Sequence, residues 1–394
     1  MMTVCGSENL KMLGSGEPPL AKKARKEKAR GKVTATTSST EIMEPCLWRE
    51  FPGDLYETVI ARLPITTFFR FRSVCQDWNS LLTSQSFSQQ CAQVKQTQPW
   101  IYVTIHGNAN DGAIYDPLSK KWYCPPVPAL PTELLVEPVA SAGGLVCFLD
   151  SEFITAYVCN LVTASFKELP PRSVDFGAIG MTMNESTPNA GYKILCVSCD
   201  GEYEIYDSTK NSWGRSGRLP SNIKCPLDLN FKSQVVSIDG MLYFMHSDPD
   251  GIVYYNMTTG VWKQILIPAH PHLSDHTLAE RGGKLMLVGL VNNSASTCIC
   301  IWELQQMTFL WKLVDRMPTL WCLEFYGKSV ELDFLANKGL VMISLRSRHK
   351  YRLITYDLSS KEWFKPPRRI PSYGRKRPWP VNGTAFHPCL TALV

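Results

Sequence analysis

Residues 51–82 read FPGDLYETVIARLPITTFFRFRSVCQDWNSLL and decide how the chain begins to fold. Apolar residues recur there at helical spacing, and Asp54 stands where it would cap the first turn. Pro64 ends this pattern, a second apolar run follows it, and a third short run surrounds Trp78. The sequence therefore predicts a small all-α unit of three short helices over residues 44–92.

Such a unit is near the lower size limit for burying its own core, and this one carries more large apolar side chains than it can hide. The surplus predicts a helical module that completes its core against another protein. The alternative is a helical cap packed on the domain that follows, which would need no partner.

The segment resembles an F-box. It has the Pro-x-Asp start, the Leu-Pro break and a Val-Cys-x-x-Trp signature over residues 74–78, although Phe51 replaces the usual Leu and Gly53 an acid. The resemblance implies that one set of residues faces a Skp-type adaptor. These residues are Phe51, Pro52, Leu55, Val59, Leu63, Pro64, Phe68, Val74, Cys75 and Trp78.

The preceding residues 1–43 are rich in Gly, Ser, Thr, Lys and Ala, which predicts a disordered tail. Between Leu20 and Lys32, seven basic residues and one acid give a surplus of six, equal to the net charge of +6 of the whole chain. A basic surface across the fold, as nucleic-acid binding would need, is therefore not indicated. The run resembles a nuclear localisation signal, with a merely solvating tail as the alternative. The candidate signal residues are Lys22, Lys23, Arg25, Lys26, Lys28 and Arg30.

The rest of the composition predicts a soluble protein of the nucleus or cytoplasm. The first residues contain no long apolar run, and no later stretch has the roughly 18 apolar residues of a membrane span. The 14 cysteines are scattered through apolar segments, as expected of small hydrophobic residues in a reducing compartment.

After Gln98, short runs of β-branched and aromatic residues bounded by Gly, Pro, Asn and Asp predict antiparallel strands. Six predicted hairpins share one feature, an acid or amide followed six residues later by an aromatic. The pairs are Asp116 and Trp122, Asn160 and Phe166, Asp207 and Trp213, Asn256 and Trp262, Glu303 and Phe309 (with Trp311 close by), and Asp357 and Trp363. A glycine opens another strand before several of them.

A glycine, an inner strand, a hairpin and a closing aromatic at a period of about 50 residues resemble kelch repeats, whose blades form a propeller. We therefore expect an all-β kelch-like propeller over residues 98–394. Six blades is the natural count, and seven stays open. The apolar run GTAFHPCLTALV, residues 383–394, is expected to supply the strand that closes the ring on the first blade. The whole chain resembles the plant F-box/kelch-repeat proteins.

Motifs for catalysis or metal binding are weak. His270, His272 and His276 fall within seven residues, but the prolines between them leave no regular face to aim the imidazoles at a metal. Cys196 and Cys199 have no second cysteine pair at zinc spacing, so core packing explains them better. We expect no catalytic residue, no cofactor and no metal.

One basic cluster near the C-terminus is a candidate for substrate binding. Clustered guanidinium groups are natural receptors for phosphate or acidic peptides. A solvated loop is the alternative to a loop that recognises an acidic or phosphorylated degradation signal. The cluster consists of Arg368, Arg369, Arg375, Lys376 and Arg377.

The resemblance implies a non-catalytic substrate receptor of an SCF-type ubiquitin-protein ligase. The F-box would bind the Skp adaptor, and through it the cullin scaffold, while the propeller would hold an unknown protein substrate. Neither a membrane nor nucleic acid is expected as a partner. Two alternatives remain open, a propeller that acts as a ligand sensor or enzyme, and a nuclear interaction protein that uses its basic tail.

Overall fold

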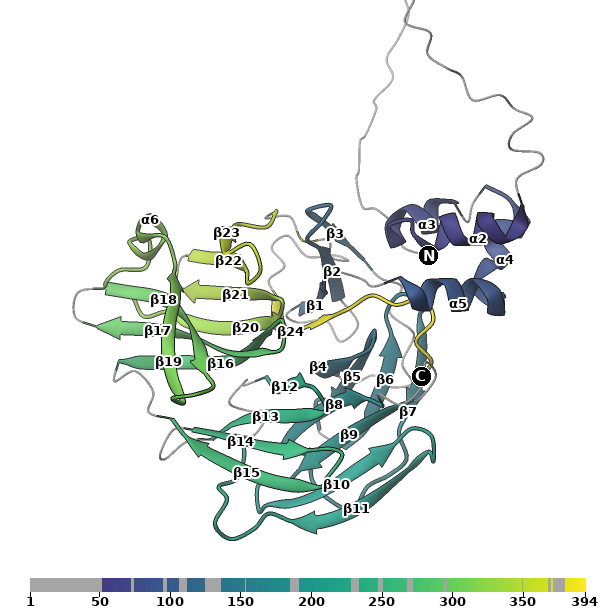
Figure 1. Ribbon diagram of the computed structural model, residues 1–394. Coiled ribbons are helices and arrows are strands. Elements are labelled where there is room, and N and C mark those ends of the chain that lie inside the picture. Colours follow the sequence, from purple (N-terminus) through teal and green to yellow (C-terminus); the bar gives the residue numbers. More distant parts are fainter. Residues whose placement is uncertain are drawn as a thin grey trace, which may run out of the picture.

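The chain folds into a group of short helices attached to a ring of β-sheets (Figure 1). The computed structural model describes residues 52–71, 74–94, 98–105, 112–124, 136–152, 154–184, 191–227, 234–246, 251–267, 272–293, 296–348, 350–367, 370 and 380–394. The predicted tail, Phe51 and all five residues of the C-terminal basic cluster lie outside these ranges. Within them, no helix is long and apolar enough to cross a membrane.

The helical module is described from residue 52 onward, and residues 44–51 of the predicted unit lie outside the described ranges. Its elements are α2 (Gly53–Ala61), α3 (Ile65–Phe71), α4 (Gln76–Ser80), the 3-10 turn η1 (Leu81–Thr83) and α5 (Gln85–Gln93). The prediction of three helices misses α5, which begins because the Ser84 side chain accepts a hydrogen bond from the Phe87 amide at 3.2 Å. Phe87 then stacks on Phe68, with ring centroids 5.3 Å apart, and closes the small core of the module.

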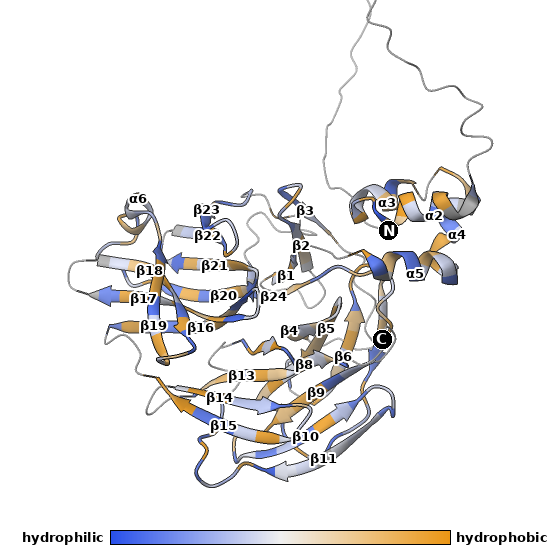
Figure 2. Ribbon diagram, viewed as in Figure 1, coloured by the Kyte–Doolittle hydropathy of each residue, from blue (hydrophilic) through white to orange (hydrophobic). Residues whose placement is uncertain are grey.

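The ring contains six blades of four antiparallel strands each, so the prediction of a six-bladed propeller is confirmed. The blades in order are β24-β1-β2-β3, β4 to β7, β8 to β11, β12 to β15, β16 to β19 and β20 to β23. A single parallel pairing, Glu280 with Lys338, joins the fifth blade to the sixth. Hydrophobic residues recur along the strands of every blade (Figure 2), and most of the core lies between neighbouring blades.

The strand bounds are β1 (Trp100–Ile105), β2 (Gly112–Asp116), β3 (Lys121–Tyr123), β4 (Val136–Ala142), β5 (Leu145–Asp150), β6 (Ala156–Asn160), β7 (Ser165–Glu168), β8 (Ala178–Met183), β9 (Tyr192–Val197), β10 (Glu202–Asp207), β11 (Ser212–Arg218), β12 (Val236–Ile238), β13 (Met241–His246), β14 (Gly251–Asn256), β15 (Val261–Leu266), β16 (Leu273–Arg281), β17 (Lys284–Asn293), β18 (Ser296–Gln305), β19 (Leu310–Arg316), β20 (Glu331–Lys338), β21 (Leu340–Ser347), β22 (Lys350–Asp357), β23 (Glu362–Phe364) and β24 (Pro380–Phe386).

The C-terminal strand closes the ring, as the sequence predicts. β24 pairs with β1, so that Phe386 lies opposite Trp100 and Ala385 opposite Ile101. The innermost strand of the first blade therefore comes from the end of the chain. The two ends of the ring are held together by a full strand pair, which leaves no open sheet edge at the junction.

The predicted hairpins share a local hydrogen-bond pattern. The carboxylate or amide oxygen that ends the strand accepts from the backbone N–H two residues later, for example Asn256 from Thr258 at 2.9 Å. The same bond forms at Asp116, Asn160, Asp207 and Asp357. The closing tryptophan then lies beside a tyrosine on the opposite strand, as in Tyr255 and Trp262 with ring centroids 4.7 Å apart.

The fifth hairpin differs from its prediction by two residues. In the other five, the residue four positions after the acid or amide has a positive φ: Lys120, Ala164, Asn211, Gly260 and Lys361. In the fifth it is Phe309, with φ of 52°, so Gln305 and not Glu303 occupies the turn position. Leu304 accordingly lies opposite Trp311. Trp311 is therefore the closing aromatic, and Phe309 is a turn residue.

Strand direction divides the connections between two faces of the ring. Every inner strand runs toward one face, where β24 ends beside the start of β1 and the helical module is attached. We call this the module face. The described connections from one blade to the next, including residues 219–227, 317–330 and 365–367, lie at the opposite face, which we call the loop face.

Candidate functional site

One side of the helical module packs on the propeller. Ile65 on α3 is buried in a cluster with Trp100, Phe386 and two residues of a hairpin turn, Leu161 and Val162. Phe69 packs against the same cluster. The helices therefore do cover part of the ring, as the cap alternative proposed, and this contact fixes how the module is oriented.

Another part of the module stays exposed and apolar. Leu55, Val59 and Val74 are 48%, 53% and 65% exposed, and Leu55 and Val59 lie one turn apart on α2. Three further predicted adaptor contacts, Pro52, Pro64 and Cys75, are exposed as well. The module thus keeps apolar surface that the propeller does not cover. We call Leu55, Val59 and Val74 the exposed F-box residues.

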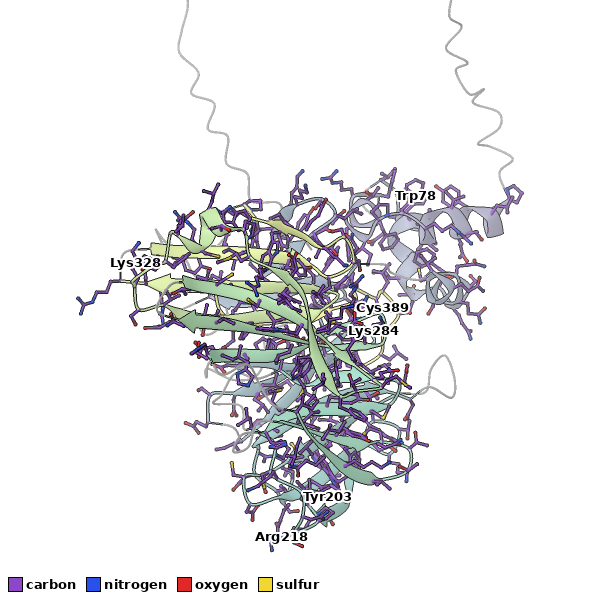
Figure 3. The ribbon with its side chains drawn as sticks, turned by 60° about the vertical axis from the view of Figure 1, so that its left-hand side comes forward. Trp78, Tyr203, Arg218, Lys284, Lys328 and Cys389 are labelled. Carbon is purple, nitrogen blue, oxygen red and sulfur yellow. The ribbon has the colours of Figure 1, made fainter. Side chains whose placement is uncertain are left out.

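Three of the predicted adaptor contacts are partly or fully buried. Phe68 is 1% exposed and belongs to the core of the module, which corrects the prediction that it faces an adaptor. Leu63 packs partly against the same core. Trp78 (Figure 3) is partly buried, with its ring centroid 5.0 Å from that of Phe71 and 5.2 Å from that of Tyr56. Its place is at the margin of the exposed surface.

The tail that follows β24 holds the module to the ring. Leu390 packs against the core of the module and also against the propeller cluster around Ile65. The Asn160 amide, which is fully buried, donates from Nδ2 to the Cys389 carbonyl at 2.9 Å and to the Ala392 carbonyl at 3.0 Å. Cys389 lies on the side of the ring that carries the module (Figure 3). We call residues 387–394 the C-terminal clasp.

A histidine of the clasp carries an altered pKa. Burial, with a smaller contribution from the positive charge of Lys338, lowers the pKa of His387 to about 4. The imidazole is therefore neutral at physiological pH. It becomes charged in the folded protein only under acid conditions.

A small cavity lies at the axis of the ring. The cavity lined by the six inner strands has a volume of about 20 Å³, enough for a water molecule or two and too small for a metabolite. Gln234 spans part of it, because its Nε2 donates to the Phe334 carbonyl at 3.1 Å and to the Gly383 carbonyl at 2.9 Å. The Asn337 amide similarly donates to the Leu278 carbonyl at 3.1 Å. These hydrogen bonds support the fold at the axis of the ring.

The weak metal motifs are separated or packed. Among the described residues, no three His, Cys, Asp or Glu side chains are grouped so as to hold a metal ion. His276 is on β16, where its Nδ1 is 2.7 Å from the Ser274 carbonyl, and His270 lies outside the described residues. Cys196 is buried in β9, while Cys199 is exposed in the following turn.

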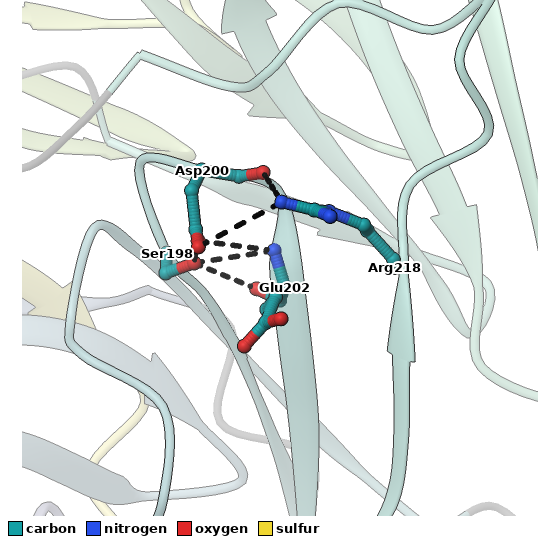
Figure 4. A network of polar contacts seen from close by, with 4 residues as sticks. All are labelled: Ser198, Asp200, Glu202 and Arg218. Carbon is teal, nitrogen blue, oxygen red and sulfur yellow. Dashed lines mark hydrogen bonds and ion pairs between the residues drawn. The ribbon is translucent and has the colours of Figure 1, made fainter.

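The loop face carries ordered polar turns (Figure 4). Between β9 and β10, the Ser198 hydroxyl donates to the Asp200 carboxylate, and the Glu202 amide donates to the Ser198 hydroxyl at 3.2 Å. The Arg218 guanidinium lies 3.9 Å from the Asp200 carboxylate. The hydrogen bond from Ser198 is the main reason that the pKa of Asp200 lies below its usual value. This rim presents fixed charges to the solvent.

Comparison with known proteins agrees with this architecture. Residues 48–90 match the F-box domain, and residues 119–373 match the F-box associated beta propeller domain. The chain belongs to the F-box proteins with an associated propeller. It is 54% identical to the F-box only protein 6 of Arabidopsis thaliana over 97% of this chain and 83% of that protein.

More distant F-box relatives cover most of the chain as well. The Protein UNUSUAL FLORAL ORGANS of Arabidopsis thaliana is 28% identical over 84% of this chain and 81% of its own length. The F-box/kelch-repeat protein At5g43190 of the same plant is 25% identical over 92% of both chains. Among solved structures, TolB from Acinetobacter baumannii aligns with a TM-score of 0.46 and 13% identity, over 78% of this chain and 71% of that chain.

The residues that hold the F-box to the propeller are the feature that sequence reasoning missed. Its signal is present in the turn after Asn160, where Leu161 and Val162 are adjacent, apolar and buried. The equivalent turn after Asp207 carries Ser208 and Thr209 instead. Two buried apolar residues in a surface turn indicate that something packs on it.

Proposed function

We propose that this protein is the substrate-receptor subunit of an SCF-type ubiquitin-protein ligase. The F-box binds a Skp-type adaptor and, through it, the cullin scaffold. The propeller holds a protein substrate on its loop face. In this role the chain needs no catalytic residue, because it raises the effective concentration of substrate lysines near the charged ubiquitin-conjugating enzyme.

One observation carries the proposal. The F-box already uses Ile65 and Phe69 to pack on the propeller, yet Leu55, Val59 and Val74 remain about half exposed or more. Fully burying a Leu or Val side chain contributes roughly 1.5–3 kcal/mol, so half-exposed ones can each contribute about 1 kcal/mol to a complex. An F-box whose own domain contact leaves this surface free is suited to bind an adaptor there.

The arrangement also separates the two binding tasks. The F-box is attached at the module face, whereas the connections between blades lie at the loop face. An adaptor and a substrate can therefore be bound at the same time without competing for surface. The clasp holds the F-box against the ring, which keeps the distance between the two bound proteins within a narrow range.

The basic cluster of residues 368–377 belongs to this proposal as a candidate substrate contact. In the sequence it falls between β23 and β24, and its five residues are outside the described ranges. Charge reversal by Arg375→Glu with Arg377→Glu should abolish substrate capture and leave adaptor binding unchanged. Capture that survives both substitutions would remove the cluster from the proposal.

The proposed role is tested by comparing ubiquitinated proteins in cells with degradation blocked. Proximity labelling is performed with the intact protein and with the Leu55→Asp, Val59→Asp variant, both changes being at exposed positions. We expect the intact protein and the variant to label the same proteins, and we expect these proteins to be ubiquitinated only in cells that contain the intact protein. If the two samples show the same ubiquitination, the protein is not a receptor that works through this F-box surface.

A further inference from the structure

The connection between the fifth and sixth blades folds into a rigid corner on the loop face. It contains the single helical turn α6 (Thr319–Cys322), continued by tight turns to Lys328. Cys322 and Phe325 point inward and are buried, and the Cys322 thiol donates to the Met317 carbonyl at 3.4 Å. These inward contacts fix the corner to the core of the two blades.

The outer side of this corner is apolar. Leu320, Leu323 and Tyr326 are 78%, 60% and 53% exposed. They are spaced three residues apart in a segment of consecutive helical turns, which places them on one side. We call these three residues the α6 stripe. A group of large exposed apolar residues on a rigid element is typical of an interaction surface.

The surroundings of the stripe are positively charged. Glu324 is held by Arg352, with Nε 2.8 Å from its carboxylate, and by Lys365, with Nζ at 3.4 Å. The Lys365 ammonium also lies 4.2 Å from the centre of the Trp321 ring. The charged residues that pair or bond at this corner are Lys328, Arg346, Arg352 and Lys365 against Glu324 and Glu331. Four positive charges minus two negative ones leave a surplus of two.

We propose that the α6 stripe and its basic rim bind a segment of the protein substrate in which large apolar side chains are flanked by acidic ones. This inference rests on the proposed function and names the surface and substrate chemistry. The apolar side chains supply contact area, and the positive rim selects acidic neighbours and rejects basic ones. The Lys328 ammonium donates to the Glu324 carbonyl at 2.6 Å, which holds this positive charge on the rim beside the stripe (Figure 3).

The position of the stripe fits a receptor. In both overall views, α6 lies at the end of the molecule away from α2 to α5 (Figure 1, Figure 3). A substrate segment on the stripe would therefore not meet an adaptor on the exposed F-box residues. It would also lie beside the start of the connection that carries the basic cluster, since Lys365 belongs to both.

The test uses a random peptide library displayed on phage and selected on the intact protein. We expect enriched peptides that combine Asp or Glu with Leu, Phe, Ile or Trp. Their affinity should fall roughly tenfold or more for the Leu320→Asp, Leu323→Asp variant, since acidic residues there repel the same peptides. Both positions are largely exposed, so an unchanged melting temperature shows that the variant folds. The matched control is Leu118→Asp with Met307→Asp, two exposed apolar residues on turns of the module face.

The proposal is overturned if no peptide is enriched, if the enriched peptides are basic, or if they bind the variant as tightly as the wild type. A short DNA duplex that binds to this rim while acidic peptides do not would overturn it as well. Adaptor binding, measured on the same variants, keeps this inference apart from the ligase role. If the α6 variant loses peptide binding and still binds the adaptor, the result concerns the α6 stripe alone. If the wild-type protein binds the peptides and does not bind the adaptor, the result contradicts the ligase role and leaves the α6 proposal standing.

Discussion

The C-terminal clasp gives a prediction whose magnitude follows from the hydrogen bonds of one residue. Asn160 is fully buried and makes four of them: Nδ2 donates to the Cys389 and Ala392 carbonyls, and Oδ1 accepts from the amides of Val162 and Thr163. Each typical hydrogen bond contributes about 1 kcal/mol, and a buried partner left unsatisfied costs more. We expect Asn160→Ala to lower the free energy of unfolding by about 4 kcal/mol.

Asn256 supplies the matched control. It occupies the same position in the fourth blade and accepts the same two turn bonds, from the amides of Thr258 and Thr259. Among the described residues, its side chain makes no hydrogen bond to the clasp. Asn256→Ala should therefore cost about 2 kcal/mol. The difference of about 2 kcal/mol between the two variants measures the attachment of the clasp.

The assay is urea unfolding monitored by tryptophan fluorescence, completed as a double-mutant cycle with deletion of residues 387–394. In the chain that lacks the clasp, Asn160→Ala should cost no more than Asn256→Ala does. Equal costs in the full-length protein would refute the reasoning, because they would show that the two carbonyl contacts contribute nothing measurable.

Four further predictions can be tested on single variants. Lowering the pH from about 6.5 to about 4 should reduce the free energy of unfolding, because His387 takes up a proton in the unfolded chain at a higher pH than in the folded one. Thermal melts at each pH measure this loss, and the dependence of the melting temperature on pH should be weaker in His387→Gln. Phe68→Ala should destabilise the F-box by about 3–5 kcal/mol, because it leaves a cavity at a buried position. Hydrogen exchange of the α2 and α5 amides measures this loss, and an unchanged exchange rate would contradict the burial of Phe68. Phe309→Gly should stabilise the protein by about 0.5–1 kcal/mol in urea, because the φ of 52° suits glycine, whereas a loss of stability would favour the hairpin alignment on Glu303. If the basic run acts as an import signal, a fluorescent fusion of the protein should lose its nuclear fraction when residues 1–43 are deleted. An unchanged distribution under the microscope would show that this run only solvates the tail.

Much of the propeller could be predicted because its hairpins are set by local chemistry. An acid or amide such as Asp116 or Asn256 satisfies the backbone of its own turn, and the tryptophan six residues later pairs across the same two strands. These contacts lie within a few residues of one another, so the spacing survives in the sequence. The closing role of residues 383–386 was also predictable, because a propeller needs its last apolar strand to pair with the first.

The fifth hairpin shows where this reasoning stops. β18 continues to Gln305, and two alignments, with Phe309 or Trp311 as the closing aromatic, fit the sequence almost equally well. The choice depends on which residue takes the positive φ in the turn, and Phe is an unusual residue for that conformation. Sequence spacing contains no information on that backbone angle.

The two sides of the F-box could not be told apart from sequence. Ile65 and Val59 are both apolar residues at helical spacing, yet Ile65 packs on the ring and Val59 is exposed. The distinction comes from Leu161 and Leu390, which lie far along the chain and meet Ile65 only after the propeller has closed. Phe68 was misplaced for the same reason, because amphipathic spacing indicates burial without saying against what.

The most direct test of the account is the affinity of the purified full-length protein for a Skp-type adaptor. It should be measured for the wild type, for Leu55→Asp with Val59→Asp, and for the exposed control Leu118→Asp. We predict tight binding by the wild type and the control, and an affinity lower by roughly a hundredfold or more for the double variant, since each buried carboxylate costs over about 1.4 kcal/mol. Equal affinities for all three proteins, or no binding by the wild type, would contradict the assignment of this surface to the adaptor.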